Sequence, residues 1–357
     1  MRKSKNSKSA SAITKYALLI LLFFTGLSFA QNPDALLERA NQLYTSGRYG
    51  QAILLYRKAE TRGADPLTVS FNIANCLFQE EKFPESIAAY RKAVDVSEGT
   101  FAPALFNLAS VLFRIGEYPE SIAAYHRALA LEPENGSAWL FLAEGYTRVG
   151  DKVGALRALL KARALNTEDL SIVYQLSEAY LALHDFENAV SLVQGAYRAH
   201  PEEVDFLVYI GDIYRLEKQY EASASSYREA LAVYPDNVSV LYKLADVLAE
   251  DNKPFVAMDI LNQILQIKPD FTDAAIFLGN LAFDLRWWER SEAAYSEAAH
   301  LGNSEAVFGF RNLSFEAYQR GDIRESVRYL QKAHTYFPDD VSLQTEIAGL
   351  EEELKEM

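Results

Sequence analysis

Hydrophobic residues recur along most of the chain at the spacing of amphipathic helices, with polar residues at the positions between them. Between residues 138 and 162, for instance, the large apolar residues Trp139, Leu142 and Tyr146 lie three and four positions apart. Residues at this spacing share one face of a helix. The pattern therefore predicts a chain of helices that each bury one face.

The hydrophobic pattern repeats with a nearly constant period. The seven letters PESIAAY occur twice, 35 positions apart, in FPESIAAYRKA (83–93) and in YPESIAAYHRA (118–128). They belong to a longer pattern, because GRYGQAILLYRKA and KQYEASASSYREA share the same skeleton. Self-similarity at a period of about 20 to 50 residues marks a repeat architecture. Nine repeats fit one frame and start at residues 33, 67, 102, 136, 170, 204, 238, 272 and 307.

Small residues hold fixed places in this frame. The eighth place is Ala, Gly or Ser in every repeat, the twentieth is Ala or Ser, and the twenty-seventh is Ala in all repeats except one, where Ile264 stands. Small side chains at fixed places let two helices approach closely. Glycines at the fifteenth place predict a turn after the first helix, at Gly47, Gly116, Gly150 and Gly321. Prolines at the thirty-second place predict the end of the second helix, at Pro133, Pro201, Pro235, Pro269 and Pro338.

The stretch AWLFLAEGYTRVGDKVGALRALLKA (138–162) closely resembles the signature of the tetratricopeptide repeat (TPR), a helix–turn–helix unit of about 34 residues. The resemblance covers residues 33–338. It implies an all-α fold, a right-handed superhelical solenoid of nine hairpins that share a continuous core. Residues 339–357 carry an apolar stripe among charged residues, which predicts a C-terminal capping helix.

The first 30 residues lie outside the repeat frame. They hold five basic residues and no acidic one, then the apolar stretch YALLILLFFTGL, then SFA before Gln31. This order predicts a secretory signal peptide (1–30) that is cleaved after Ala30, so that the protein is exported to the periplasm or secreted. An uncleaved membrane anchor stays open as an alternative, although about 14 apolar residues are few for a span of roughly 20.

Charge and cysteine content narrow the choice of partner. The net charge is −14, and removal of the five leader cations brings it to about −19. Such a balance opposes binding to nucleic acid or to an anionic membrane surface. We expect membrane contact only through the leader, if it is retained. Cys76 is the only cysteine, so no internal disulfide is possible.

No constellation of residues predicts an enzyme. The five histidines are scattered, and none forms HExxH or another paired metal spacing. The nucleophile-elbow, phosphate-binding and dinucleotide-binding motifs are missing from the sequence. We therefore expect no catalytic residue, no metal and no cofactor, which leaves recognition as the function.

The family resemblance also implies where recognition takes place. In TPR proteins the first helices line a concave groove, and ligands contact the second, fifth, sixth, ninth, twelfth and thirteenth places of the repeat. Aromatic residues and amides at these places suit an extended peptide, because they offer apolar area together with hydrogen-bond donors and acceptors. We predict a peptide-binding site in repeats one to three at Asn41, Tyr44, Phe71, Asn72, Asn75, Phe78, Phe106, Asn107, Phe113 and Arg114. A secondary patch is predicted at Phe277, Asn280, Phe283, Arg311, Asn312, Phe315 and Tyr318.

Packing is the competing interpretation of these residues. An aromatic residue at the twelfth place often packs between helices and never meets a ligand. Asparagine is a mediocre helix former with no packing reason to recur, so its recurrence favours binding. Between the two patches the same places carry charges that we expect to keep the groove hydrated, at Glu144, Arg148, Glu178, Asp212, Arg215, Asp246 and Glu250.

These observations together predict an exported, non-enzymatic TPR scaffold that binds a protein or peptide in bacterial envelope assembly or maintenance. Two alternatives stay open. One is a receptor for a small apolar ligand or lipid enclosed by the superhelix. The other is a membrane-tethered assembly factor whose leader is never cleaved.

Overall fold

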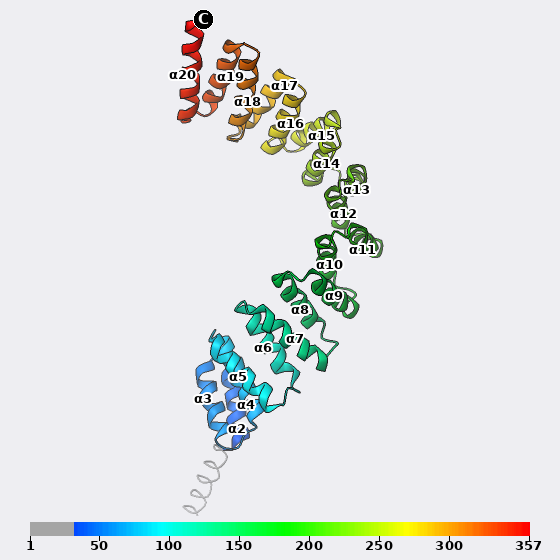
Figure 1. The fold of residues 1–357 in the computed structure, drawn as a ribbon, viewed down its shortest axis with the longest axis vertical. Helices are drawn as coiled ribbons and strands as arrows, with labels where there is room; N and C mark the ends of the chain where they lie inside the picture. Colours follow the sequence, from blue (N-terminus) through cyan, green and yellow to red (C-terminus); the bar gives the residue numbers. More distant parts are fainter. Residues whose placement is uncertain (1–31) are drawn as a thin grey trace, which may run out of the picture. The chain divides into compact units, whose positions relative to one another are not determined.

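The computed structural model describes residues 32–357, and every regular element in this part of the chain is a helix (Figure 1). The predicted signal peptide lies outside the described residues. Each repeat consists of a first and a second helix, and the first helices begin within one residue of the predicted starts. The all-α fold of tandem TPR-like hairpins is thereby confirmed.

The first helices of the nine repeats are α2 (Pro33–Thr45), α4 (Pro66–Gln79), α6 (Ala102–Arg114), α8 (Gly136–Val149), α10 (Ser171–Ala182), α12 (Asp205–Leu216), α14 (Val238–Glu250), α16 (Thr272–Asp284) and α18 (Ala306–Gln319). The second helices are α3 (Tyr49–Glu60), α5 (Phe83–Val96), α7 (Tyr118–Leu131), α9 (Lys152–Leu165), α11 (Phe186–Ala199), α13 (Tyr220–Val233), α15 (Pro254–Ile267), α17 (Trp288–His300) and α19 (Ile323–Tyr336). A last helix, α20 (Val341–Glu356), follows the ninth repeat.

The chain divides into two compact units. The first unit ends at Leu183 and contains α2 to α10, and the second begins at His184 and contains α11 to α20. Within each unit, a helix packs mainly against the helices that precede and follow it in the sequence. The boundary falls inside the predicted fifth repeat, and the predicted domain limits stay a prediction.

The small residues of the repeat frame lie where the two helices of a hairpin touch. In four repeats a serine at the twentieth place is fully buried and donates its hydroxyl to the backbone carbonyl of the eighth place. Ser86 Oγ lies 3.0 Å from the Ala74 oxygen, and Ser121 Oγ lies 2.8 Å from the Ala109 oxygen. A larger side chain at either place would force the helices apart, because protein interiors are close-packed.

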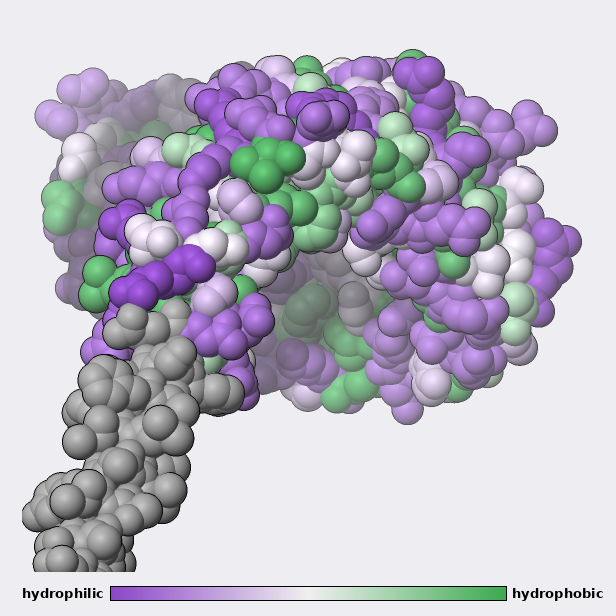
Figure 2. All heavy atoms as spheres, turned by 90° about the horizontal axis from the view of Figure 1, so that it is seen from below, coloured by the Kyte–Doolittle hydropathy of each residue, from purple (hydrophilic) through white to green (hydrophobic). Residues whose placement is uncertain are grey.

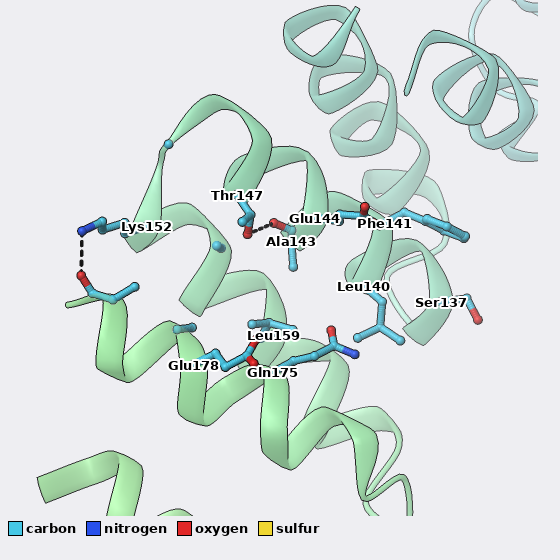
Figure 3. A pocket seen from close by; sticks show the side chains of 14 residues that line it. Ser137, Leu140, Phe141, Ala143, Glu144, Thr147, Lys152, Leu159, Gln175 and Glu178 are labelled. Carbon is cyan, nitrogen blue, oxygen red and sulfur yellow. Dashed lines mark hydrogen bonds between the residues drawn. The ribbon is translucent and has the colours of Figure 1, made fainter. Parts of the chain in front are cut away.

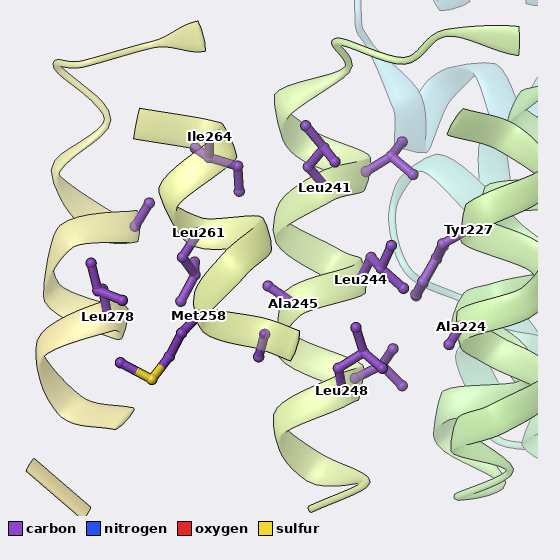
Figure 4. Close-up of a cluster of buried hydrophobic side chains, with 14 of the residues drawn as sticks. Ala224, Tyr227, Leu241, Leu244, Ala245, Leu248, Met258, Leu261, Ile264 and Leu278 are labelled. Carbon is purple, nitrogen blue, oxygen red and sulfur yellow. The ribbon is translucent and has the colours of Figure 1, made fainter. Parts of the chain in front are cut away.

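The second unit shows how neighbouring hairpins share a core (Figure 4). In α14, Leu244 lies toward Tyr227 of α13, so that consecutive repeats meet through a first helix and the preceding second helix. In α15, Met258 and Leu261 lie toward Leu278 of α16. Within this unit the hairpins of repeats six, seven and eight therefore share one core, as expected when one repeat cannot bury its apolar face alone.

Every repeat turns through one residue in the left-handed conformation, at the fifteenth place. Four of these residues are the predicted glycines, whose φ angles lie between 76° and 85°. The other five carry a side chain, which the sequence pattern did not reveal: Glu81, His184, Lys218, Asn252 and Arg286, with φ between 57° and 62°. The left-handed conformation costs a non-glycine residue about 1–2 kcal/mol. Packing of the two helices thus imposes the turn even where the local sequence opposes it.

The helix α20 packs against α19 and buries Leu343, with Ile347 and Leu350 partly covered. Its remaining faces are mostly polar. Most of the surface seen in Figure 2 is hydrophilic, and its hydrophobic residues form small separate groups. Among the described helices, none is both long enough and apolar enough to span a membrane.

Candidate functional site

The first helices of the first unit carry the predicted peptide-binding residues, and we call their shared surface the first-helix face. Four of those residues line one hollow of about 280 Å³: Tyr44 of α2, Asn75 and Phe78 of α4, and Asn107 of α6. Sequence reasoning did not single out the other lining residues, which are Gln79, Tyr90, Ser110 and Val111. The structure leaves six predicted residues outside this hollow: Asn41, Phe71, Asn72, Phe106, Phe113 and Arg114.

Buried tyrosines explain why asparagine recurs at the ninth place. Tyr90 Oη donates to Asn75 Oδ1 at 2.5 Å, and Tyr295 Oη donates to Asn280 Oδ1 at 2.7 Å. Burial raises the pKa of Tyr295 to about 12, so its hydroxyl stays a proton donor. A buried hydroxyl without an acceptor costs about 1–3 kcal/mol, which the amide oxygen prevents. The expectation that these asparagines have no packing reason to recur is therefore wrong.

The same pairing links the ninth and twenty-fourth places in other repeats. Tyr56 Oη donates to Asn41 Oδ1 at 2.5 Å, and Tyr227 Oη donates to Asp212 Oδ1 at 2.6 Å. The hydroxyls of Ser110 and Tyr125 lie 3.0 Å apart. Where the twenty-fourth place is Leu or Val instead, the ninth place has no tyrosine to satisfy: Leu159 with Glu144, Val193 with Glu178, Leu261 with Asp246, and Leu330 with Phe315.

A second hydrogen bond connects neighbouring repeats at the sixth place. Asn107 Nδ2 donates to Asn75 Oδ1 at 3.0 Å. In the second unit, Lys243 Nζ lies 2.6 and 2.7 Å from the two carboxylate oxygens of Asp212. The oxygen of Asn75 therefore accepts from two neighbours, and only its Nδ2 donor remains for a ligand.

The aromatic residues at the twelfth place pack inside their own hairpins. Tyr44 lies edge-on to Tyr49 with ring centroids 5.5 Å apart, and Phe113 lies edge-on to Tyr118 at 5.2 Å. The rings of Phe78 and Phe83 are 6.0 Å apart, with the Arg114 guanidinium over both. These contacts favour the packing interpretation for one side of each ring.

The remaining predicted residues divide into packed and available ones. Phe71 lies edge-on to Tyr90 and Phe101. Asn72 and Phe106 are half-buried, and among the described residues neither side chain has a hydrogen-bond or ring partner. Asn72 and Phe106 are thus the predicted residues most available for contact.

The secondary patch is divided by the last helix. Arg311, Asn312, Phe315 and Tyr318 of α18 line a cavity of about 640 Å³ beside α20, while Phe277, Asn280 and Phe283 do not. Arg311 forms ion pairs with Asp340 and Glu346, and Tyr318 Oη lies 3.1 Å from a carboxylate oxygen of Glu353. Phe277 and Phe283 contact Tyr242 and Trp288, and Phe315 is exposed.

The charged residues of repeats six and seven pair with one another. Arg215 lies 2.6 Å from Asp246 and binds Glu250 through two hydrogen bonds of 2.8 and 2.9 Å. The hydrogen bonds from Arg215 lower the pKa of Glu250, while burial raises the pKa of Asp246. Together with the Lys243–Asp212 pair, these contacts occupy the polar side chains that a ligand would otherwise meet.

One cavity of the first unit was not predicted from the sequence. It measures about 790 Å³ and lies between α8, α9 and α10 (Figure 3). Its walls are mostly apolar, and polar side chains stand among them. The lining residues are Ser137, Leu140, Phe141, Ala143, Glu144, Thr147, Gly150, Lys152, Ala155, Leu159, Gln175, Glu178, Ala179 and Ala182.

The described residues hold neither a cluster of metal ligands nor a reactive thiol. Residues 32–357 contain no cluster of three or more His, Cys, Asp or Glu side chains that could hold a metal ion. Cys76 is buried in α4, and burial raises the pKa of its thiol to about 12. A thiol that stays protonated is a poor nucleophile.

Two family models of the tetratricopeptide repeat match the sequence. One matches residues 8–103, 174–237 and 217–270, and the other matches residues 102–135. No curated protein matches the sequence.

Solved structures with similar folds include several TPR proteins. The C-terminal part of a TPR repeat-containing protein from Cytophaga hutchinsonii is 15% identical, with a TM-score of 0.50, and the match covers 76% of this chain and 98% of that one. A chain in the structure of Naa15/Naa10 bound to HypK-THB is 14% identical, with a TM-score of 0.56, and the match covers 90% of this chain and 61% of that one. YrrB, described as a TPR protein with an unusual peptide-binding site, is 20% identical over 52% of this chain and 95% of its own, with a TM-score of 0.40.

Proposed function

Because the chain belongs to the tetratricopeptide repeat family, we propose that it is a non-enzymatic scaffold that binds a protein or peptide on its first-helix face. The observation that carries this proposal is the hollow lined by Tyr44, Asn75, Phe78 and Asn107. It brings aromatic carbon and amide groups from three successive repeats to one place.

The hydrogen bonds of the hollow determine what it offers. The Asn75 oxygen is engaged by Tyr90 and Asn107, whereas its Nδ2 group remains free to donate. A peptide would therefore present backbone carbonyls to the amides, and its side chains would contact the accessible sides of the rings. Phe106 and Asn72, which lie on the same helices, extend this surface.

Occlusion of the hollow tests the proposal. Gln79 lines the hollow and is exposed, so Gln79→Trp should block it without disturbing the core. Gln51→Trp, the same change at an exposed position of α3, is the matched control. Crosslinking and pull-down from the native envelope fraction should lose the partner in the first variant only. A partner retained by both variants would contradict binding in this hollow.

A single truncation measures the aromatic contribution. Phe106→Ala should weaken binding of the captured partner by more than about 1 kcal/mol if Phe106 is a hot spot. The corresponding variants Phe71→Ala and Phe78→Ala test the two other phenylalanines. They require a folding control by circular dichroism, because both rings also pack against neighbouring rings. Unchanged affinity in a folded Phe106→Ala variant would show that the Phe106 ring does not contribute to binding.

We further propose that the protein is exported and serves bacterial envelope assembly or maintenance. The support is the order of basic, apolar and small residues before Gln31. N-terminal sequencing of the mature protein tests it: Gln31 at the terminus means release, and Met1 means a tethered assembly factor.

A receptor for a small apolar ligand or lipid is the second candidate, favoured by the 790 Å³ cavity of the first unit. Cavities of about 300–1,000 Å³ accommodate small molecules. Mass spectrometry of gently extracted protein should reveal a stoichiometric ligand if this candidate is right, and none if the cavity serves a polypeptide.

A further inference from the structure

The cavity of repeats four and five is lined at three places by side chains that are smaller than those of most other repeats. Tyrosine occupies the twenty-fourth place in five repeats, but the fourth repeat has Leu159 there. On α10, Ala179 and Ala182 stand at the tenth and thirteenth places, where most repeats carry larger residues. The wall formed by α9 therefore lacks an aromatic ring, and the facing wall formed by α10 has only short alanine side chains at these two places.

The walls of the cavity are apolar at their base. Leu140, Ala155 and Leu159 line it together with Ala179. Phe141 stands at the side, stacked on Tyr125 with ring planes 8° apart and centroids at 6.1 Å. Such a lining favours aliphatic carbon over water, since burial of apolar area yields about 25 cal/mol per Å².

The charges around the cavity leave one carboxylate unpaired. Glu144 is paired with Arg148 at 3.1 Å. Lys152 Nζ donates to the Ala182 carbonyl at 2.7 Å, at the C-terminal end of α10, where a cation is favourable (Figure 3). In the described part of the chain, Glu178 has no ion-pair partner. An occupant that covers Glu178 must supply a positive charge, because a carboxylate buried without a partner is strongly destabilising.

We propose that this cavity, which we call the repeat-four pocket, binds a lysine or arginine side chain together with an aliphatic neighbour on a partner polypeptide. The aliphatic part lies against Leu140 and Leu159, and the cation pairs with Glu178. Anionic lipids and fatty acids are disfavoured, because their carboxylate or phosphate would face Glu178 and Glu144. The inference rests on the proposed function, to which it adds the chemistry of the partner.

The repeat frame provides a variant that fills the pocket. Tyr56, Tyr90 and Tyr125 are accommodated opposite an alanine at the eighth place, and the fourth repeat has Ala143 at that place. Leu159→Tyr should therefore fold, place a ring in the pocket and bring its hydroxyl near Glu144. Leu160→Tyr is the matched control, because Leu160 is exposed on the same helix and does not line the pocket.

A second pair of variants tests the charge. Glu178→Gln removes the unpaired carboxylate at nearly constant volume. Glu134→Gln is its control, since Glu134 is exposed and lies outside the pocket. Neither pair touches the hollow of repeats one to three, so the two sites can be tested separately.

The experiment is a selection from a phage library of random 12-residue peptides on the purified chain, followed by affinity measurement of the best synthetic peptides. We expect the selected peptides to combine Lys or Arg with an adjacent aliphatic residue. Leu159→Tyr should weaken their binding at least about tenfold and Glu178→Gln about three- to tenfold. Lys→norleucine in the peptide should abolish the effect of Glu178→Gln, which a double-mutant cycle measures.

Each other outcome overturns the inference in a distinct way. Peptides that bind wild type and Leu159→Tyr equally would show polypeptide binding elsewhere, and the proposed function would stand without the pocket. Loss in Leu159→Tyr without selection of basic residues would contradict the cation. If no peptide is selected at all, the pocket assignment fails, and the pull-down with Gln79→Trp and Gln51→Trp decides the proposed function separately.

Discussion

Repeats four and six follow the same frame but differ at its twenty-fourth place, where repeat four has Leu159 and repeat six has Tyr227. In repeat six the tyrosine is buried, its hydroxyl bonds to Asp212, and Lys243 of the next repeat completes the cluster. In repeat four the ring is missing, and a cavity of about 790 Å³ lies between its helices and α10 of repeat five, whose Glu178 has no ion-pair partner among the described residues. Leucine at the twenty-fourth place, together with Ala179 and Ala182 on the facing helix, thus separates a surface whose polar groups are paired from one with room for a ligand.

The largest effect on stability is expected when repeat six is changed to resemble repeat four. Tyr227→Leu removes a fully buried ring and leaves Asp212 without its hydroxyl donor. We expect the free energy of unfolding of the second unit to fall by about 2–4 kcal/mol. Urea denaturation combined with hydrogen exchange of α12 to α15 measures the loss. Tyr234→Leu, at an exposed position just after the same helix, should have little effect.

The pH dependence of stability should differ between paired and unpaired carboxylates. Arg328 and Lys332 hold the pKa of Glu292 at about 2, below its ordinary value of 4.5. The stabilising contribution of Glu292 is therefore complete above pH 4.5 and is lost as the pH falls from 4.5 through about 2.

We expect Glu292→Gln to lower stability by about 1–2 kcal/mol at pH 7, with the difference from wild type shrinking toward pH 2. Glu178→Gln, which removes an unpaired carboxylate, should stay within about 0.5 kcal/mol of wild type at pH 7. Urea titrations at several pH values test both variants. A pH-independent loss in Glu292→Gln would assign its role to packing.

Repeats four and six also differ in the residue that takes the left-handed conformation at the turn. Gly150 and Lys218 occupy the same place with φ of 81° and 62°. Lys218→Gly should stabilise the second unit by about 1 kcal/mol, and Gly150→Lys should destabilise the first by a similar amount. Thermal unfolding with hydrogen exchange of the affected hairpins provides the measurement. Equal and small changes in both would mean that the turns carry no strain.

The smallest effect is expected when repeat four is made to resemble repeat six. Leu159→Tyr fills the repeat-four pocket and should raise stability by about 0.5–1 kcal/mol. Leu160→Tyr should leave it unchanged. A marked loss of stability in Leu159→Tyr, seen as a lower melting temperature, would show that α8 and α10 stand too close for a ring.

The fold was predictable because its signals are repeated nine times. Small residues at the eighth, twentieth and twenty-seventh places specify where helices touch, and one irregular repeat does not disturb the pattern. The positive φ of Lys218 and Arg286 was not predictable, since neither residue favours that conformation and tertiary packing imposes it.

The candidate site was less predictable than the fold. The asparagines were visible in the sequence, but their tyrosine partners lie 15 residues away on another helix, so a core hydrogen bond resembled a binding motif. The repeat-four pocket forms where side chains are smaller than in other repeats, and such a gap has no motif of its own in the sequence. A signal for it did exist, namely leucine in place of tyrosine at Leu159, although its meaning depends on the opposite wall formed by Ala179 and Ala182.

The pairing of the ninth and twenty-fourth places also constrains how this protein can change over generations. A mutation of Asn41 or Asn75 alters the binding surface, but it also leaves the hydroxyl of Tyr56 or Tyr90 without its acceptor. Two simultaneous changes are then needed to alter specificity without loss of stability. Repeats four and five, which carry Leu159 and Val193 at the twenty-fourth place, are free of this coupling. New specificities should therefore arise first at Glu144 and Glu178, while the tyrosine-bearing repeats drift slowly.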